Sequence, residues 1–171
     1  MSEAQIRPAR RDDCGRISEI YNYYIKNTAI SFEEEGVSIK EMEARMESIT
    51  RRFPWLVHEA DGVIKGYAYL SAWKERSAYR YTAETTIYIE KDETGKGIGN
   101  GLLGNLVEEA RRRELHVLMA VIALPNESSI RLHQKYGFRK AAHFKEVGRK
   151  FGVWQDVGYW ELRLGDSLIG D

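Results

Sequence analysis

The sequence predicts a mixed α/β fold in a single domain over residues 1–171. Segments whose apolar residues recur every three or four positions alternate with short segments that are continuously apolar or alternating, so helices and strands follow one another. The sequence contains no internal repeat and no low-complexity segment. A chain of this length buries roughly 70% of the surface that its unfolded form exposes, which is enough for one hydrophobic core.

The N-terminal part begins with a strand followed by two helices. The segment AQIRPAR is typical of a short strand, and Asp12 or Asp13 can cap a helix that continues through Tyr24. Ser38, with Glu41 three residues later, predicts a capping box at the start of a second helix.

Three strands come next, and the first two form a hairpin. PWLVHEADGVIKGYAYLSAW contains Asp61 and Gly62, and an Asp-Gly pair between apolar segments is a strong signal for a two-residue turn. YTAETTIYIE then alternates and places Thr82, Glu84 and Thr86 on one face of a strand. The aromatic-rich segments SAWKERSAYRY and KFGVWQDVGYW are interpreted as strands and walls of a pocket.

A run of five glycines separates this strand from the next helix. They stand at positions 95, 97, 99, 101 and 104 of EKDETGKGIGNGLLGNL, and the leucines among and after them predict a helix to about Arg113. Such a junction can bind a phosphate, because glycines let backbone N–H groups converge and the helix N-terminus adds partial positive charge.

Two other interpretations of the glycine run are open. Gly99 to Gly104 spells the dinucleotide fingerprint G-x-G-x-x-G, but it lies inside the helix, and the next strand ends in Ala123, Leu124 and Pro125 without an acidic residue. Alternatively, the first three glycines only turn the chain, and the last two let the helix pack closely. No P-loop motif fits the run, which argues against an NTPase.

The last third of the chain predicts a strand, a short helix and a closing strand. HVLMAVIAL is continuously apolar, as in a strand buried on both faces, and Pro125 ends it. ESSIRLHQKY predicts a helix that stops at Gly137, a common helix-terminating residue. GVWQDVGYWELRL predicts the final strand.

Composition excludes several classes of protein. The 26 basic residues balance the 26 acidic residues, so we expect no nucleic-acid partner. Cys14 is the only cysteine and is interpreted as inert packing in a reducing compartment, while His58, His116 and His143 have no partners at ligand spacing, so no metal is expected. Without a signal-peptide pattern or an apolar stretch of membrane-spanning length, we expect a cytoplasmic protein without a membrane partner.

The segments from Thr82 to Phe138 resemble the GNAT family of acyl-CoA-dependent N-acetyltransferases. In that family a strand leads into the loop [RQ]-x-x-G-x-[GA], which here reads TGKGIG from Thr94 to Gly99. YTAETTIYI, ALPNESSIRLHQKYGF and EVGRKFGVWQDVGYW are similar to the branch that acetylates phosphinothricin and methionine sulfone or sulfoximine. The resemblance covers nearly the whole chain. It implies a central, mostly antiparallel, twisted sheet flanked by helices, acetyl-CoA as co-substrate, and a homodimer whose partner borders the acceptor site.

One residue departs from the family pattern. Thr94 stands where the family usually has arginine or glutamine. Because backbone N–H groups supply most of the grip on the pyrophosphate, we expect a modest effect on coenzyme affinity and none on the fold.

The resemblance also implies the coenzyme-binding residues. The strand backbone would bind the pantetheine arm as an added strand does, and the glycine loop would hold the pyrophosphate. Asn126 would reach the pantetheine arm, unless it serves only as a helix cap. The expected coenzyme-binding residues are Ile87, Tyr88, Ile89, Gly95, Lys96, Gly97, Ile98, Gly99, Asn100 and Asn126.

Acetyl transfer needs a neutral amine, and two residues are candidates for moving its proton. An α-amino group with a pKa near 8 costs roughly 1.4 kcal/mol to deprotonate at pH 7, so a base helps. Glu84 precedes the glycine loop, where desolvation can raise its pKa, although it can instead form a surface ion pair with Arg80 or with a cation of another strand. His133 stands where the family usually has a tyrosine; it can carry a proton to the thiolate or from the amine, or simply pack in its helix.

The acceptor site is predicted from cations and aromatic residues. Lys74, Arg76 and Arg80 precede the strand of Glu84, and an arginine fork suits the carboxylate of an amino acid, although the same residues also fit a solvated basic loop. Phe32 and Trp154 are candidate walls of the pocket.

Together the residues and the resemblance predict transfer of acetyl from acetyl-CoA to the α-amine of a small amino-acid analogue. Phosphinothricin, methionine sulfoximine and methionine sulfone are the candidate acceptors, and the choice depends on pocket shape at the ångström scale. Direct attack in a ternary complex is expected, since Cys14 lies far from the motifs in sequence. The alternatives are a protein or peptide N-acetyltransferase and a non-catalytic acyl-CoA-binding module.

Overall fold

The computed structural model describes residues 4–165, which form one seven-stranded sheet with α-helices on both faces. The strand order is β1-β2-β3-β4-β5-β7-β6, and β4 and β5 are the parallel neighbours in an otherwise antiparallel sheet. The predicted mixed α/β class and the mostly antiparallel sheet are therefore confirmed. The strands are β1 Gln5–Pro8, β2 Trp55–Ala60, β3 Val63–Ala72, β4 Thr82–Ile89, β5 Val117–Leu124, β6 Arg139–Lys150 and β7 Val153–Arg163; the helices are α1 Cys14–Asn27, α2 Ile39–Thr50, α3 Ile98–Arg112 and α4 Glu127–Lys135.

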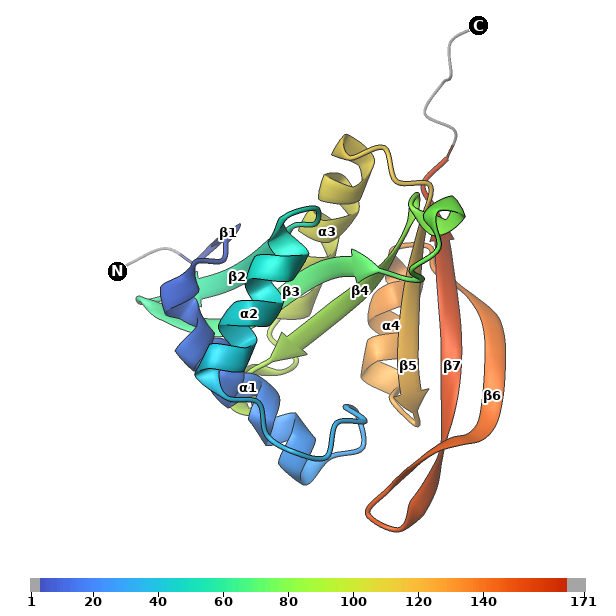
Figure 1. Cartoon of the computed structure of the whole chain (residues 1–171), viewed down its shortest axis with the longest axis horizontal. Helices are drawn as coiled ribbons and strands as arrows, with labels where there is room; N and C mark the ends of the chain where they lie inside the picture. Colours follow the sequence, from blue (N-terminus) through green and yellow to red (C-terminus); the bar gives the residue numbers. More distant parts are fainter. Residues whose placement is uncertain (1–3, 166–171) are drawn as a thin grey trace, which may run out of the picture.

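Two hydrophobic clusters lie on opposite faces of the sheet. Helices α1 and α2 cover one face, where Ile17 and Met42 pack with Tyr67 of β3. Helices α3 and α4 cover the other face, where Leu103 packs with Leu118 of β5. Figure 1 shows this three-layer arrangement, with the two helix pairs separated by the twisted sheet. Side chains that alternate along a central strand therefore point into different clusters.

The lone cysteine is part of the first cluster. The Cys14 side chain is fully buried, with its Sγ 3.8 Å from Sδ of Met46, and burial raises the pKa of the thiol to about 11. The prediction of an inert packing residue is confirmed.

Several short-range predictions are confirmed in detail. Asp61 and Gly62 adopt φ values of 52° and 73°, as a two-residue turn between β2 and β3 requires. Gly137 ends α4 with a φ of 91°. An added Cβ on Gly104 would lie 2.8 Å from the hydroxyl of Tyr136, so close packing explains this glycine, with the end of α4 as its neighbour.

Asp13 occupies the N-cap position of α1, as predicted, but its side chain does not cap the helix. The carboxylate of Asp13 makes no cap bond to α1; it accepts from both terminal nitrogens of Arg7, at 2.8 and 3.0 Å, and from the backbone N–H of Arg10 at 2.6 Å. The partly buried Arg7 competes for the aspartate, and α1 follows a short 3-10 turn at Arg11–Asp13.

The largest error in the predicted elements concerns β6, which the sequence did not suggest. This strand lies at the edge of the sheet, is rich in charged residues and is mostly exposed, so it lacks the apolar alternation of a half-buried strand. Its register also shifts between Phe144 and Gly148. The opposite error concerns SAWKERSAYRY: after Ala72 the chain leaves the sheet and forms a 3-10 turn at Ser77–Tyr79.

Helix α2 begins at the predicted cap. The hydroxyl of Ser38 accepts from the backbone N–H of Glu41 at 3.1 Å. The second half of the predicted capping box is not formed, because the Glu41 carboxylate instead accepts from Arg45 at 3.0 Å.

We expect Ser38→Ala to lower the free energy of unfolding by about 1 kcal/mol, because the first turn of α2 loses its side-chain acceptor. Urea unfolding followed by circular dichroism measures this loss. Ser48→Ala is the matched control, since Ser48 is an exposed residue inside the same helix and should change little. Equal stability of the two variants would contradict the role of Ser38.

Candidate active site

Strands β4 and β5 pair over only part of their length. Their parallel register runs from Thr82 opposite Val117 to Glu84 opposite Met119 and then stops, although the strands continue to Ile89 and Leu124. Figure 1 shows the two strands diverging beyond this point. Each remains paired on its other side, β4 with β3 and β5 with β7. Two strand edges without a mutual ladder therefore face each other.

A cleft of about 710 Å³ occupies the region where β4 and β5 diverge. It is bounded by both strands, by the glycine loop before α3 and by the first turns of α4. The predicted residues that line it are Glu84, Ile87, Tyr88, Ile89, Gly95, Gly97, Ile98, Gly99, Asn100, Asn126 and His133. Of the residues expected to act in catalysis or coenzyme binding, only Lys96 is not part of this lining.

The start of α3 offers unsatisfied backbone donors to the cleft. Its N-cap is Gly97, which has a φ of 85° and no side-chain cap bond. Gly95 also has a positive φ, of 77°, and added Cβ atoms on both glycines would meet nothing within 4 Å. The first N–H groups of a helix carry partial positive charge, so this open turn suits a phosphate group. The cradle therefore fits the coenzyme A pyrophosphate.

Charges at the mouth of the cleft are balanced by two lysines. Glu93 accepts from Lys96 at 2.8 Å and pairs with Lys65 at 3.2 Å, and these partners hold the pKa of its carboxyl below the usual range. Lys96, predicted to contact the coenzyme, is thus engaged with a residue of the cleft wall. Thr94 directs its hydroxyl to the carbonyl of Lys91, at 3.3 Å, so its side chain has a local partner.

Glu84 lies at the closed end of the cleft, in the last residue pair of the parallel ladder. Its carboxylate forms no hydrogen bond or ion pair with any residue in 4–165. Burial raises the pKa of the Glu84 carboxyl, and the positive charge of Lys74 opposes this rise. The alternative ion pair with Arg80 is not formed, because that guanidinium lies 4.5 Å from the ring centre of Tyr81 and donates to the carbonyl of Ser77.

His133 lies on the α4 wall and is only 5% exposed. Its Nδ1 is 2.8 Å from the carbonyl oxygen of Ser129, so Nδ1 carries the proton in the neutral ring. Nε2 is then the acceptor, and the hydroxyl of Thr85 lies within hydrogen-bond distance of it, at 3.3 Å. Burial lowers the pKa of His133, although the bond to Ser129 opposes this, and the ring is therefore neutral at pH 7.

The two candidates face opposite sides of the sheet. Glu84 alternates with Ala83, which belongs to the α3 cluster, so its side chain points to the α1 and α2 face. His133 approaches from the α4 side and contacts Thr85. The cleft passes between the strands, so one ligand lying in it can meet both residues.

Other predicted residues have partners of their own. Asn126 accepts from the backbone N–H of Ser129 at 3.3 Å, so the helix-cap alternative is realised even though Asn126 also lines the cleft. The carbonyl of Ile89 is occupied by the hydroxyl of Tyr24 at 2.6 Å, which leaves fewer free backbone groups at that residue.

The five predicted acceptor residues lie outside the lining of the cleft. Lys74, Arg76 and Arg80 are exposed in the turn between β3 and β4. Phe32 is in the loop between α1 and α2, and Trp154, near the start of β7, is 57% exposed. The only one linked to a predicted catalytic residue is Lys74, through its electrostatic effect on Glu84.

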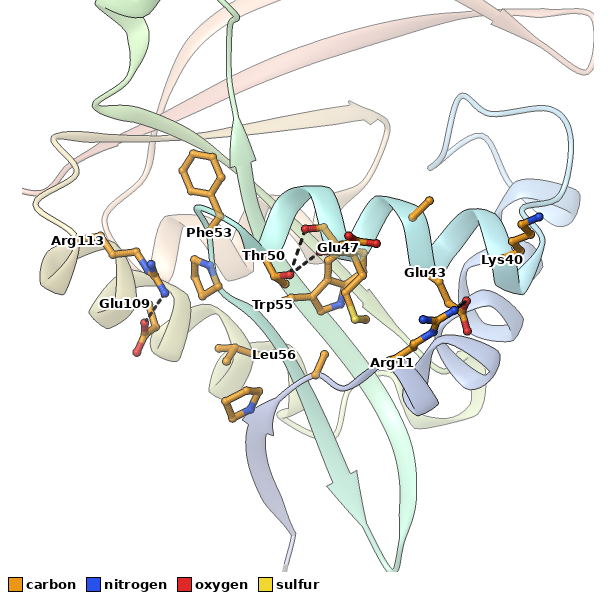
Figure 2. A pocket seen from close by; sticks show the side chains of 15 residues that line it. Arg11, Lys40, Glu43, Glu47, Thr50, Phe53, Trp55, Leu56, Glu109 and Arg113 are labelled. Carbon is orange, nitrogen blue, oxygen red and sulfur yellow. Dashed lines mark hydrogen bonds and ion pairs between the residues drawn. The ribbon is translucent and has the colours of Figure 1, made fainter.

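A second cleft, of about 690 Å³, lies between α2, the start of β2 and the end of α3 (Figure 2). It contains none of the predicted site residues. Four of its charged groups form pairs: Arg11 lies 2.8 Å from Glu43, and Arg113 lies 3.5 Å from Glu109. Glu47, also in the lining, pairs at 3.5 Å with Arg51, which is outside it.

The described part of the chain shows no candidate metal site and no candidate membrane-spanning helix. Within residues 4–165 no group of three or more histidine, cysteine or acidic side chains is placed to hold a metal ion. None of the helices in this range is long and apolar enough to cross a membrane.

Comparison with known proteins assigns the family. Residues 6–158 match a family model described as an acetyltransferase (GNAT) domain. The chain belongs to the GNAT acetyltransferase family. The resemblance drawn from the glycine loop and its neighbouring segments is therefore confirmed.

Relatives of this GNAT acetyltransferase act on several kinds of amine. This chain is 38% identical over 167 residues to L-methionine sulfoximine/L-methionine sulfone acetyltransferase of Salmonella typhimurium, and the match covers 97% of this chain and 98% of the relative. A phosphinothricin acetyltransferase from Sinorhizobium meliloti, solved in complex with AcCoA, matches with a TM-score of 0.94 and 35% identity over 99% of this chain and 93% of that one. A ribosomal-protein-alanine N-acetyltransferase from Brucella melitensis matches with a TM-score of 0.91 and 36% identity over 93% and 99%.

The structure adds lining residues that the sequence did not indicate. Tyr24 and Ile30 reach this acetyltransferase cleft from the end of α1 and the loop after it, and Thr85 and Leu132 complete the walls beside His133. Apolar and hydroxyl side chains are common throughout a sequence, so their type alone does not mark them as cleft residues. The contact of α1 with β4 also joins segments that are distant in the chain, which local patterns do not reveal.

We expect Gly97→Ala to weaken acetyl-CoA binding by about tenfold, because an alanine at positive φ costs about 1–2 kcal/mol and shifts the backbone donors of this turn. Titration calorimetry with acetyl-CoA measures the affinity.

The matched control is Gly62→Ala, because Gly62 also has a positive φ, of 73°, and open space around its added Cβ. It should lose similar stability and retain wild-type affinity. If both variants bound acetyl-CoA as well as the wild type, the glycine turn would not be the pyrophosphate site.

Proposed function

We propose that this GNAT acetyltransferase transfers acetyl from acetyl-CoA to the α-amine of a small amino-acid analogue, of the kind represented by phosphinothricin, methionine sulfoximine and methionine sulfone. The observation that carries the proposal is the Glu84 carboxylate, unpaired within residues 4–165, at the closed end of a cleft whose other end is an open glycine turn. The names of two relatives support the acceptor class.

In this proposal the cleft walls hold acetyl-CoA and Glu84 activates the acceptor. When bound, acetyl-CoA supplies the acetyl thioester. The turn from Gly95 to Asn100 would hold the pyrophosphate, and the unpaired edge of β4 would orient the pantetheine arm. Glu84, directly or through a water, would take the proton of the acceptor ammonium and leave a neutral amine to attack.

His133 is proposed as a proton carrier on the opposite side of the cleft. Its Nδ1 is committed to Ser129, so only Nε2 can exchange a proton with a ligand. A neutral ring can take a proton from solvent or from the acceptor and deliver it to the departing thiolate. Because His133 and Glu84 lie on opposite faces of the sheet, protonation of the thiolate and deprotonation of the amine would take place on opposite sides of the ligand.

The acceptor carboxylate is assigned to the basic turn before β4. Lys74, Arg76 and Arg80 lie there, and the charge of Lys74 acts on Glu84, which supports a carboxylate bound beside the base. Phe32 and Trp154 remain proposed walls of the acceptor site.

A protein N-acetyltransferase is the second candidate, favoured by the likeness to the ribosomal-protein-alanine enzyme. A peptide substrate also presents an α-amine, but it lacks the free carboxylate that the basic turn suits. A non-catalytic acyl-CoA-binding module is disfavoured, because the cleft retains an unpaired acid at position 84.

A panel of amines separates these functions. We expect thiol release from acetyl-CoA with phosphinothricin, methionine sulfoximine or methionine sulfone, and much slower release with an alanine-starting peptide, which lacks a free carboxylate near the amine. Release with the peptide alone would favour the second candidate. If the protein bound acetyl-CoA but released no thiol with any amine, the non-catalytic binding module would be favoured.

We expect Glu84→Gln to lower turnover by about a hundredfold or more while acetyl-CoA affinity stays unchanged, because an amide cannot accept the ammonium proton. The same variant should gain stability relative to the wild type as pH rises. Burial raises the folded-state pKa of Glu84, so ionisation destabilises the wild-type fold as pH passes through that pKa, and glutamine escapes this loss.

Steady-state kinetics and urea unfolding at several pH values measure both effects. Glu75→Gln, in the exposed turn after β3, is the control for removing a carboxylate. Wild-type turnover in Glu84→Gln would reject the base.

We also propose a homodimer whose partner borders the acceptor site, in the cytoplasm. Large apolar side chains are exposed along β6, β7 and the turn between them, as expected of an interface: Phe144, Val147, Phe151, Val153 and Trp154. Light scattering measures the assembly directly, and a mass near 19.8 kDa, that of one chain, would reject the dimer.

A further inference from the structure

The loop between α1 and α2, residues 28–38, forms part of the cleft wall. Ile30 of this loop lines the cleft beside Tyr24. The loop belongs to the α1 and α2 layer, which is the face of the sheet toward which Glu84 points (Figure 1). The loop therefore bounds the cleft on the face of the sheet toward which Glu84 points.

A buried lysine from a distant strand fixes this loop. Lys150, the last residue of β6, is 2% exposed and donates through Nζ to the carbonyl of Ser31 at 2.6 Å. Lysine is rarely buried to this extent, because removing its amine from water is costly. Burial lowers the pKa of Lys150, while the carboxylates of Glu34 and Glu33 in the same loop oppose this.

An apolar contact joins the same two segments. An ideal Cβ on Gly148 would lie 2.3 Å from Cε2 of Phe32, so the missing side chain lets the phenyl ring rest against the backbone of β6. Two neighbouring loop residues, Ser31 and Phe32, thus bind to the same end of β6. One contact is polar and the other is apolar.

The inner side of the loop connects to the wall of the cleft. The Ser31 hydroxyl lies 2.9 Å from the hydroxyl of Tyr21, whose ring meets the edge of Tyr88 at 4.9 Å between centres. Glu33 accepts from two nitrogens of Arg45 at 2.6 and 2.9 Å. The loop is therefore pinned to α1 and α2 on one side, and on the other side Lys150 is its polar anchor.

We propose that Lys150 is a positioning residue that holds loop 28–38 against the acceptor side of the cleft, and so sets affinity for the amine rather than for acetyl-CoA. The inference rests on the proposed function for the identity of the acceptor. Lys150 is not one of the residues that line the cleft, and neither is Ser31, to which it donates. Its effect is transmitted through Ser31 and Ile30.

The test uses Lys150→Met in the full chain, with hydrogen exchange and kinetics measured together. We expect faster amide exchange in residues 28–38 and a KM for the amine raised by about tenfold, since the loop loses a hydrogen bond from a charged donor. The KM for acetyl-CoA should stay within about twofold, because the pyrophosphate turn lies elsewhere.

Two further variants complete the test. Lys145→Met removes an exposed lysine from the same strand and should match the wild type in every measurement. Gly148→Ala displaces Phe32 and should also speed amide exchange in the loop and raise the KM for the amine. If either Lys150→Met or Gly148→Ala fails to fold, the other variant still tests the proposal.

Unchanged loop exchange, or equal changes in both KM values, would overturn the proposal. If the wild type acetylated no amine, the proposed function would fall, whereas loop exchange would still decide whether Lys150 anchors the loop.

Discussion

The early end of the β4–β5 ladder is the constraint on which the site depends. Parallel neighbours need a crossover, and here α3 supplies it from the open end of β4 back to the start of β5. The two strands can separate after Glu84 and Met119 because each keeps a full antiparallel partner on its outer side. The sheet thus gains a wedge with free backbone edges without losing its order. The glycine turn lies at the open end of the wedge, and the candidate proton-transfer residues lie at its closed end.

This geometry divides the cleft into two chemical environments. Toward α1 and α2, the half-buried carboxylate of Glu84 has no hydrogen-bond or ion-pair partner among residues 4–165 and is influenced by the exposed Lys74. Toward α3 and α4, a neutral histidine is fixed by one backbone carbonyl. Unpaired burial of Glu84 is costly for folding, and burial of a neutral ring is much less so. Glu84 thus lowers the stability of the fold at a position where the proposed reaction needs a carboxylate that can accept a proton.

Local sequence signals predicted much of this arrangement. The Asp61–Gly62 turn, the cap at Ser38 and the glycine turn depend on residues within a few positions of each other, and such chemistry is readable from sequence. The clustering of Glu84 and His133 at one cleft was accessible only through the family resemblance, because they come from different elements.

What the sequence did not indicate depends on long-range contacts. Edge strand β6 is exposed and charged, so no periodicity marks it. The bond between Lys150 and Ser31 joins residues 119 positions apart, and a lysine in a charged strand gives no sign of burial. The competition of Arg7 for Asp13 likewise required the fold, since the arginine belongs to β1 and the aspartate was expected to cap α1.

The burial of Cys14 has a consequence for a reaction whose by-product is a free thiol. Coenzyme A released in acetyl transfer can exchange with protein disulfides or, once oxidised, with exposed protein thiolates. In this chain the only thiol is sealed beneath α2 against Met46, and burial raises its pKa to about 11, so little thiolate forms. The folded protein is therefore resistant to mixed disulfides with its own product. Thiol-reactive dyes should report coenzyme A without a contribution from the protein.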